Sequence, residues 1–125
     1  MAVLQSNLAH VLAGIFLMGG WAFIANITHS WLAAFEAGLL QGLITGTMTF
    51  FIKKAIEWVA SNTTGVVTPT LAASAISATV LTTIHTIAGT PAFWATVLVP
   101  FTVATIYGAT YTFTLRRAFA VSRAR

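Results

Sequence analysis

The chain has 125 residues, of which 58% are hydrophobic and only 6% are charged, and its formal net charge is +4. Soluble domains carry about a quarter charged residues, so this chain has too few charges to cover a water-facing surface, and we predict that lipid surrounds it. The absence of cysteine excludes disulfides and thiolate metal sites. The absence of aspartate leaves Glu36 and Glu57 as the only acidic side chains.

The fold is predicted to be all-α: a single domain over residues 1–125 that forms an integral membrane bundle of four transmembrane helices. A helix needs about 20 apolar residues to cross a bilayer, and the chain has room for four such segments joined by short connections. The segments are predicted over residues 8–27, 31–60, 69–88 and 91–117.

Short polar or glycine-containing stretches mark the expected ends of these helices. Ser30 is a candidate cap for the second helix, because a short side-chain oxygen can accept hydrogen bonds from unpaired backbone N–H groups. The Thr68–Pro69 and Thr90–Pro91 pairs have the pattern of helix starts, in which threonine caps the helix and proline occupies its first position. Gly89 is expected to end the third helix.

The basic residues that indicate topology form two pairs, each near the end of an apolar segment: Lys53 and Lys54 in the second helix, Arg116 and Arg117 in the fourth. Lysine and arginine are enriched on the cytoplasmic side of membrane proteins, so both chain termini are predicted to be cytoplasmic. The same residues can attract anionic membrane lipids, and their placement argues against nucleic-acid binding. We expect a multi-pass protein of a cell membrane, with a prokaryotic inner membrane as its setting.

A glycine stripe marks one face of the second helix, since Gly38, Gly42 and Gly46 recur every four residues. In lipid, such a stripe lets another helix backbone approach closely. We favour packing against another helix of the same chain, and the alternative is a seam between copies in a homo-oligomer.

Glu36 lies inside the apolar run of the second helix. Ionisable residues in spans are costly and tend to face a bundle interior or a wet cavity, where they serve a function. Glu36 is therefore a candidate group for proton coupling or gating. The alternative is a carboxylate that reaches out to the head groups, where its cost is small. By helical periodicity it faces away from the glycine stripe.

His85, on the third helix, is predicted to lie at a similar depth to Glu36, and a pair of the two could relay protons. With His29 in the first turn, they would form a set of two histidines and one carboxylate that could bind a metal. None of these residues has the spacing of a known motif, so we favour structural roles for the histidines and predict neither a metal nor a cofactor.

Hydroxyl and amide side chains are frequent in the predicted spans. Threonine commonly returns its hydrogen bond to its own helix, and this explains most of them. In the alternative interpretation they line a polar pathway, with Gln41, Thr47, Pro100 and Tyr107 as candidate lining residues. Pro100 is also expected to bend the fourth helix.

The sequence contains no Ser–His–acid spacing, phosphate-binding glycine loop or paired acids, so we predict that the protein is not an enzyme. Its size and four-helix plan are similar to those of small multidrug transporters, whose essential glutamate lies in the first helix, but residues 8–27 contain no acidic residue. The first hypothesis is a homo-oligomeric transporter or flippase in which Glu36 couples or gates. The alternative is a non-catalytic accessory or assembly subunit that packs against a larger membrane protein complex.

Overall fold

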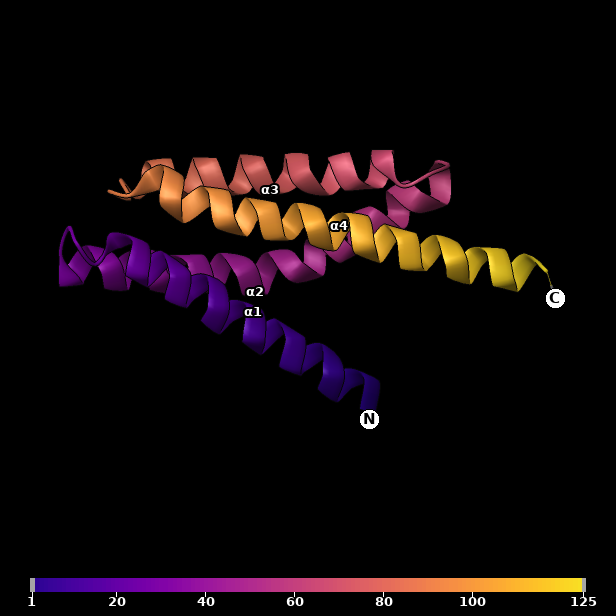
Figure 1. The fold of residues 1–125 in the computed structure, drawn as a ribbon, viewed down its shortest axis with the longest axis horizontal. Coiled ribbons are helices and arrows are strands. Elements are labelled where there is room, and N and C mark those ends of the chain that lie inside the picture. Colours follow the sequence, from indigo (N-terminus) through magenta and orange to yellow (C-terminus); the bar gives the residue numbers. More distant parts are fainter. Residues whose placement is uncertain (1, 125) are drawn as a thin grey trace.

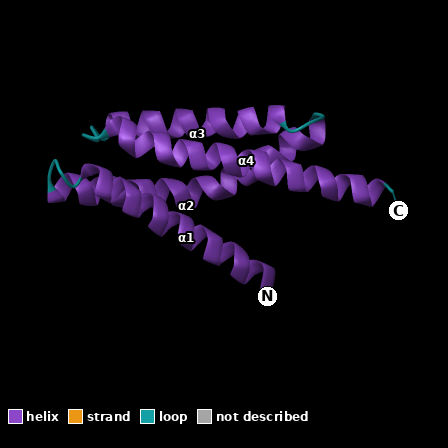
Figure 2. Ribbon diagram, viewed as in Figure 1, coloured by secondary structure: helices purple, strands orange, loops and turns teal. Residues whose placement is uncertain are grey.

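The structure is a computed structural model that describes residues 2–124, with side chains described from Leu8 onward. It contains four helices joined by short loops (Figure 2). They are α1 (Ala2–Asn26), α2 (Trp31–Asn62), α3 (Val67–Ile87) and α4 (Phe93–Arg123). Each is long and apolar enough to cross a membrane. The predicted all-α fold with four potential membrane spans is therefore confirmed, whereas the side on which the termini lie stays a prediction.

The helices run antiparallel in chain order (Figure 1). Both termini and the α2–α3 loop lie toward one end of the bundle, which we call the terminal end. The α1–α2 and α3–α4 loops lie at the other end, which we call the loop end. Helix α1 packs beside α2 near the loop end and diverges from α4 toward the terminal end.

Two of the predicted helix ends are confirmed. The Ser30 hydroxyl accepts a hydrogen bond of 3.0 Å from the backbone N–H of Ala33, so Ser30 caps α2. Gly89 follows α3 with a φ of 64°, a left-handed conformation that glycine adopts without the cost that a Cβ atom imposes. The chain can therefore turn directly into the α3–α4 loop.

The two Thr-Pro predictions are wrong in detail. Helix α3 begins at Val67 without a side-chain cap, so Thr68 and Pro69 lie inside its first turn. Helix α4 begins at Phe93, beyond Thr90 and Pro91. The Thr90 hydroxyl forms a hydrogen bond with the His85 ring instead of capping α4, because the loop folds that side chain back onto α3.

The glycine stripe of α2 faces α1. A Cβ atom built at Gly19 would lie 2.8 Å from the carbonyl oxygen of Gly38, and one at Gly46 would lie 2.9 Å from Ile15 Cδ1. Gly42 is buried against the same face of α1. The stripe is thus packed against α1 within one chain.

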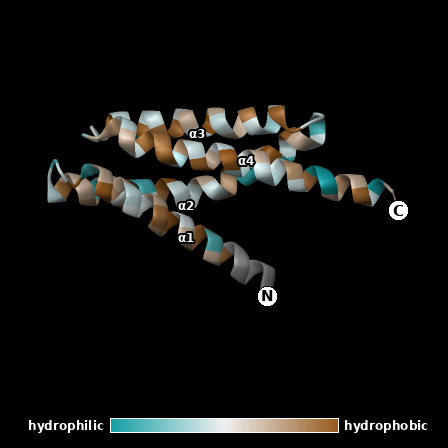
Figure 3. Ribbon diagram, in the orientation of Figure 1, coloured by the Kyte–Doolittle hydropathy of each residue, from teal (hydrophilic) through white to brown (hydrophobic). Residues whose placement is uncertain are grey.

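The core lies between α2, α3 and α4. One buried cluster joins Ile44, Leu81 and Val97, and a second cluster nearer the terminal end joins Ile52, Ile56 and Ala73. Many other large apolar side chains point outward, and apolar residues cover most of the length of the helices (Figure 3). Such exposure is typical of helices that contact lipid and not of a water-facing surface.

Candidate functional site

A cavity of about 260 Å³ lies between the four helices, and each helix contributes to its wall. Its lining residues, in chain order, are His10, Gly14, Leu17, Met18, Ile44, Thr45, Met48, Thr49, Ile52, Ser77, Val80, Leu81, Pro100, Val103, Ala104 and Tyr107. An engineered apolar cavity of roughly 150 Å³ is large enough to bind benzene, so this cavity has room for a small or slender ligand.

Hydrogen bonds at the loop end hold α1 to the segment that begins α4. Trp21 Nε1 donates to the carbonyl of Ala95 at 2.7 Å. The Asn26 amide donates to Thr96 Oγ1 at 2.8 Å and accepts from the backbone N–H of Ala92 at 2.9 Å. Asn26 is fully buried, so water does not compete for its two hydrogen bonds. Together with the Trp21 bond they fix the loop end of α1.

The cavity wall is exposed where α1 and α4 form it. Leu17 of α1 and Val103 of α4 both line the cavity, and they remain 66% and 46% exposed. Toward the terminal end the two helices separate further (Figure 1). This part of the wall therefore faces the surroundings of the helices at the level of their apolar segments, where a bilayer would supply lipid.

The cavity wall is mainly apolar and carries a few hydroxyl groups. Thr49 donates its hydroxyl hydrogen to the carbonyl of Thr45 on its own helix at 2.8 Å. Ser77, on α3, is only 3% exposed, and its hydroxyl has no hydrogen-bond partner within the described part of the chain. A buried unpaired hydroxyl costs about 1–3 kcal/mol, so a ligand or a water molecule that offers a polar atom here would be stabilised.

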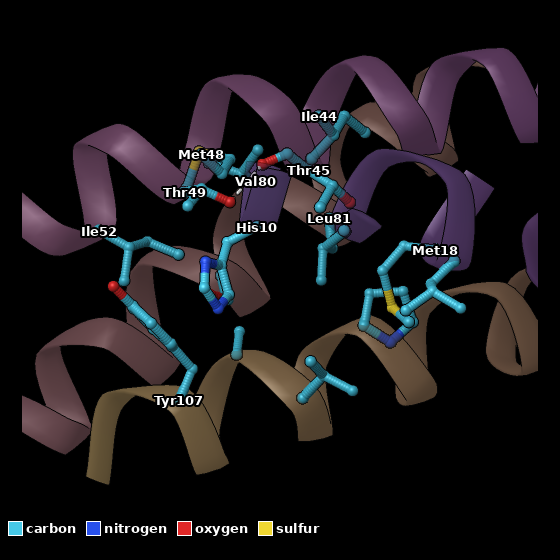
Figure 4. Close-up of a pocket in the computed structure, with 16 residues that line it drawn as sticks. His10, Met18, Ile44, Thr45, Met48, Thr49, Ile52, Val80, Leu81 and Tyr107 are labelled. Atoms are coloured by element: carbon cyan, nitrogen blue, oxygen red, sulfur yellow. Dashed lines mark hydrogen bonds between the residues drawn. The ribbon is translucent and has the colours of Figure 1, made fainter. Parts of the chain in front are cut away.

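The two ends of the cavity differ in polarity. His10, Ile52 and Tyr107 gather at one end, and Met18 lies at the other (Figure 4). The Tyr107 ring stacks on the Tyr111 ring, with 5.6 Å between centroids. The polar end therefore lies toward the terminal end of the bundle, where the lysines and arginines are also found.

An ionic cluster lies beyond Tyr107. Tyr111 donates its hydroxyl hydrogen to Glu57 Oε1 at 2.7 Å. Glu57 Oε2 lies 3.7 Å from Lys54 Nζ. These charged groups lie at the terminal end of the cavity.

Two of the four predicted pathway residues lie in the cavity wall, namely Pro100 and Tyr107. Helix α4 continues unbroken through Pro100. Gln41 is buried instead among α2–α3 contacts, where its amide donates to Thr45 Oγ1 at 3.1 Å. Thr47 is exposed on a different face of α2.

Glu36 and His85 are not brought together, which corrects the expected pair. The His85 ring is fully buried, and its nitrogens lie 2.9 Å from Gln41 Oε1 and 2.8 Å from Thr90 Oγ1. Both ring nitrogens are thus occupied by neutral groups. Glu36 is exposed, and it makes no hydrogen bond or ion pair among residues 8–124. The set formed with His29 is also absent, since no three potential metal ligands cluster anywhere in the described residues.

No protein-family model, curated protein or solved structure matches this chain. The functional interpretation therefore depends on the cavity itself. An apolar chamber with a polar end and an exposed wall can bind an amphipathic molecule and exchange it with lipid.

Sequence reasoning missed His10 and Ser77 as cavity residues. A four-residue repeat on α2 was the available signal, because Thr45 and Thr49 share a face that meets the cavity. The identity of the helix opposite that face depends on bundle geometry, which the repeat does not encode.

The hydrogen bond between His85 and Gln41 should couple α2 to α3. We expect the double-mutant cycle of His85→Leu and Gln41→Leu to give a coupling energy of roughly 0.6–1.7 kcal/mol, the range from average to largest for side-chain hydrogen bonds between membrane helices. Unfolding by SDS in mixed micelles would measure it. His29→Leu, at an exposed turn residue, should show no coupling to Gln41→Leu. Additive effects of His85→Leu and Gln41→Leu would contradict the role assigned to this bond.

Proposed function

We propose that this chain is a small multi-pass membrane transporter of the flippase type, with both termini cytoplasmic. The cavity between the helices would bind an amphipathic substrate, and an opening between α1 and α4 would exchange that substrate with the bilayer. The observation that supports the proposal is a mainly apolar cavity whose wall includes the exposed side chains of Leu17 on α1 and Val103 on α4. A water-soluble substrate would require a more polar chamber.

A second copy of the chain would complete the transporter. Glu36, Leu43 and Thr47 are exposed on one face of α2. A carboxylate facing lipid in the apolar zone is costly, so a neighbouring copy on this face would shield it. Glu36 would then couple or gate from the interface between copies, whereas the cavity in each copy would bind substrate.

Filling the cavity should stop transport. Ala104 lines the cavity and is partly buried, so Ala104→Trp would occupy much of its volume. In liposomes that contain a fluorescent lipid, we expect the purified protein to accelerate exchange between leaflets and Ala104→Trp to lower that rate at least tenfold. The matched control is Ala75→Trp on the exposed face of α3. Equal rates for wild type and Ala104→Trp would contradict the proposal.

Glu36→Gln separates coupling from binding in the same assay. Glu36 is remote from the cavity wall, so its substitution should leave ligand binding unchanged and reduce transport. Unchanged transport in this variant would remove Glu36 from the mechanism.

The second candidate function is an accessory subunit of a larger membrane complex. It is favoured by the same exposed carboxylate, because a partner protein could provide the polar contact that Glu36 lacks within the described chain. Native mass spectrometry after gentle extraction distinguishes the two functions. A homo-oligomer supports the transporter, and a stable complex with a different membrane protein supports the subunit.

A further inference from the structure

Lys53 extends the cavity wall toward the terminal end. Thr45, Thr49 and Lys53 are spaced by four residues, so they follow one another along one face of α2. Thr45 and Thr49 line the cavity, which places Lys53 one helical turn beyond its wall. Its Nζ lies 5.8 Å from the centroid of the Tyr111 ring, and Tyr111 stacks on Tyr107, which also lines the cavity.

Lys53 has no ion-pair partner among the residues whose side chains the structure describes. Its side chain is half-buried. Glu57 is engaged by Lys54 and Tyr111, and Glu36 lies on another face of α2. An ammonium that is partly withdrawn from water and forms no ion pair favours an anionic ligand beside it.

The dimensions of the cavity limit the apolar part of that ligand. Its volume of about 260 Å³ lies just below the range of roughly 300–1,000 Å³ found for pockets that bind drug-sized molecules. Two acyl chains would not fit in it, whereas one chain could extend from the polar end toward Met18 and lean out between α1 and α4. Long lysine side chains commonly place their charge at the boundary between apolar and polar regions.

We infer that the cavity binds a single-chain amphiphile with an anionic head group, such as a long-chain carboxylate. The acyl chain lies between α1 and α4, and Lys53 holds the head group at the terminal end beside Tyr107. This inference rests on the proposed function, because it specifies the substrate class of the same cavity. It also gives Lys53 a role beyond that of a topology anchor.

The test uses the full chain in nanodiscs of zwitterionic phosphatidylcholine, with a dodecanoate that carries a photoactivatable diazirine in its chain. Irradiation followed by peptide mapping should place the label on cavity residues such as Met48 and Ser77. Unlabelled dodecanoate should compete for this site, and dodecyltrimethylammonium, which has the same chain and the opposite charge, should not. Lys53→Gln should raise the probe concentration for half-maximal labelling about fivefold, as expected for the loss of one lysine near an anionic group.

Two variants make the test specific. Lys54→Gln removes the same charge one residue away and should label like wild type, because Lys54 is directed to Glu57. Lys53→Arg keeps the charge and should also bind. If dodecyltrimethylammonium competes as well as dodecanoate, or if the two glutamine variants behave alike, the anionic specificity is wrong and the transporter proposal survives. If neither the dodecanoate probe nor a diazirine probe with a cationic head group labels the cavity, both the anionic specificity and the proposed function fail.

Discussion

Gly19→Ala is expected to destabilise the packing of α1 on α2, because the added methyl group would meet backbone atoms that have no room to move. The new Cβ would lie 2.8 Å from the carbonyl oxygen of Gly38 and 3.4 Å from the Cα of Gly42. A flexible side chain could move aside, but a helix backbone must shift as a whole. Overpacking of this kind typically costs about 1–3 kcal/mol, and SDS unfolding in mixed micelles would measure it.

The neighbouring glycine provides the control for this prediction. A Cβ atom at Gly20 would have no other atom within 4 Å apart from its immediate helix surroundings. Gly20→Ala should therefore be neutral or stabilise α1 by about 0.5–1 kcal/mol through helix propensity. If the two alanine variants were equally stable, the close contact between α1 and α2 would not exist as described.

The close packing of α1 at Gly19 also bears on the cavity. Contacts near the loop end fix α1 to α2 and, through Trp21 and Asn26, to the start of α4. Toward the terminal end α1 stands apart from α4, and residues of both helices line the cavity. Gly19→Ala should therefore disturb substrate exchange as well as stability, since it alters the point from which α1 diverges.

The number and type of the helices could be predicted because they depend on local properties of the chain. Four apolar segments of sufficient length are visible in the sequence. In lipid, backbone N–H and C=O groups must be hydrogen-bonded within the protein, so apolar segments without an alternating strand pattern are expected to form helices. Helix starts were less predictable. Thr90 has a capping side chain at a suitable position, but its hydroxyl binds His85, and such a tertiary contact is invisible to a local rule.

The candidate site was only partly predictable for a related reason. Glu36 attracts attention because carboxylates are rare in spans, yet it lies away from the cavity. Pro100 and Tyr107 were selected with a polar pathway in mind and lie in the wall of a mainly apolar cavity. Lys53 was interpreted as a topology signal that can also attract anionic lipids, and not as a residue of a binding site. In each case the residue was noticeable, but its neighbours depend on how four helices face one another.

Arg116→Gln is expected to be more destabilising than Arg117→Gln, although both variants lose one positive charge from the same turn of α4. The Arg116 guanidinium donates to the carbonyls of Ala60, Thr63 and Gly65 at 2.6, 2.7 and 3.0 Å. It therefore provides hydrogen-bond donors for backbone carbonyls at the end of α2 and in the loop that follows.

Hydrogen bonds that involve a charged group contribute about 1.5–3 kcal/mol each and are not additive, which leads us to expect a loss of about 2–3 kcal/mol for Arg116→Gln. Arg117 instead lies over the exposed Phe113 ring at 4.5 Å, a contact worth about 0.5–1 kcal/mol. Thermal unfolding in detergent would compare the two stabilities, and accessibility labelling of the termini in cells would show whether topology changes. A topology effect alone would be equal in the two variants, because the positive-inside rule counts charges and not contacts. If stability fell equally, Arg116 would be acting only as a charge, and its place at the end of α2 would have no energetic role.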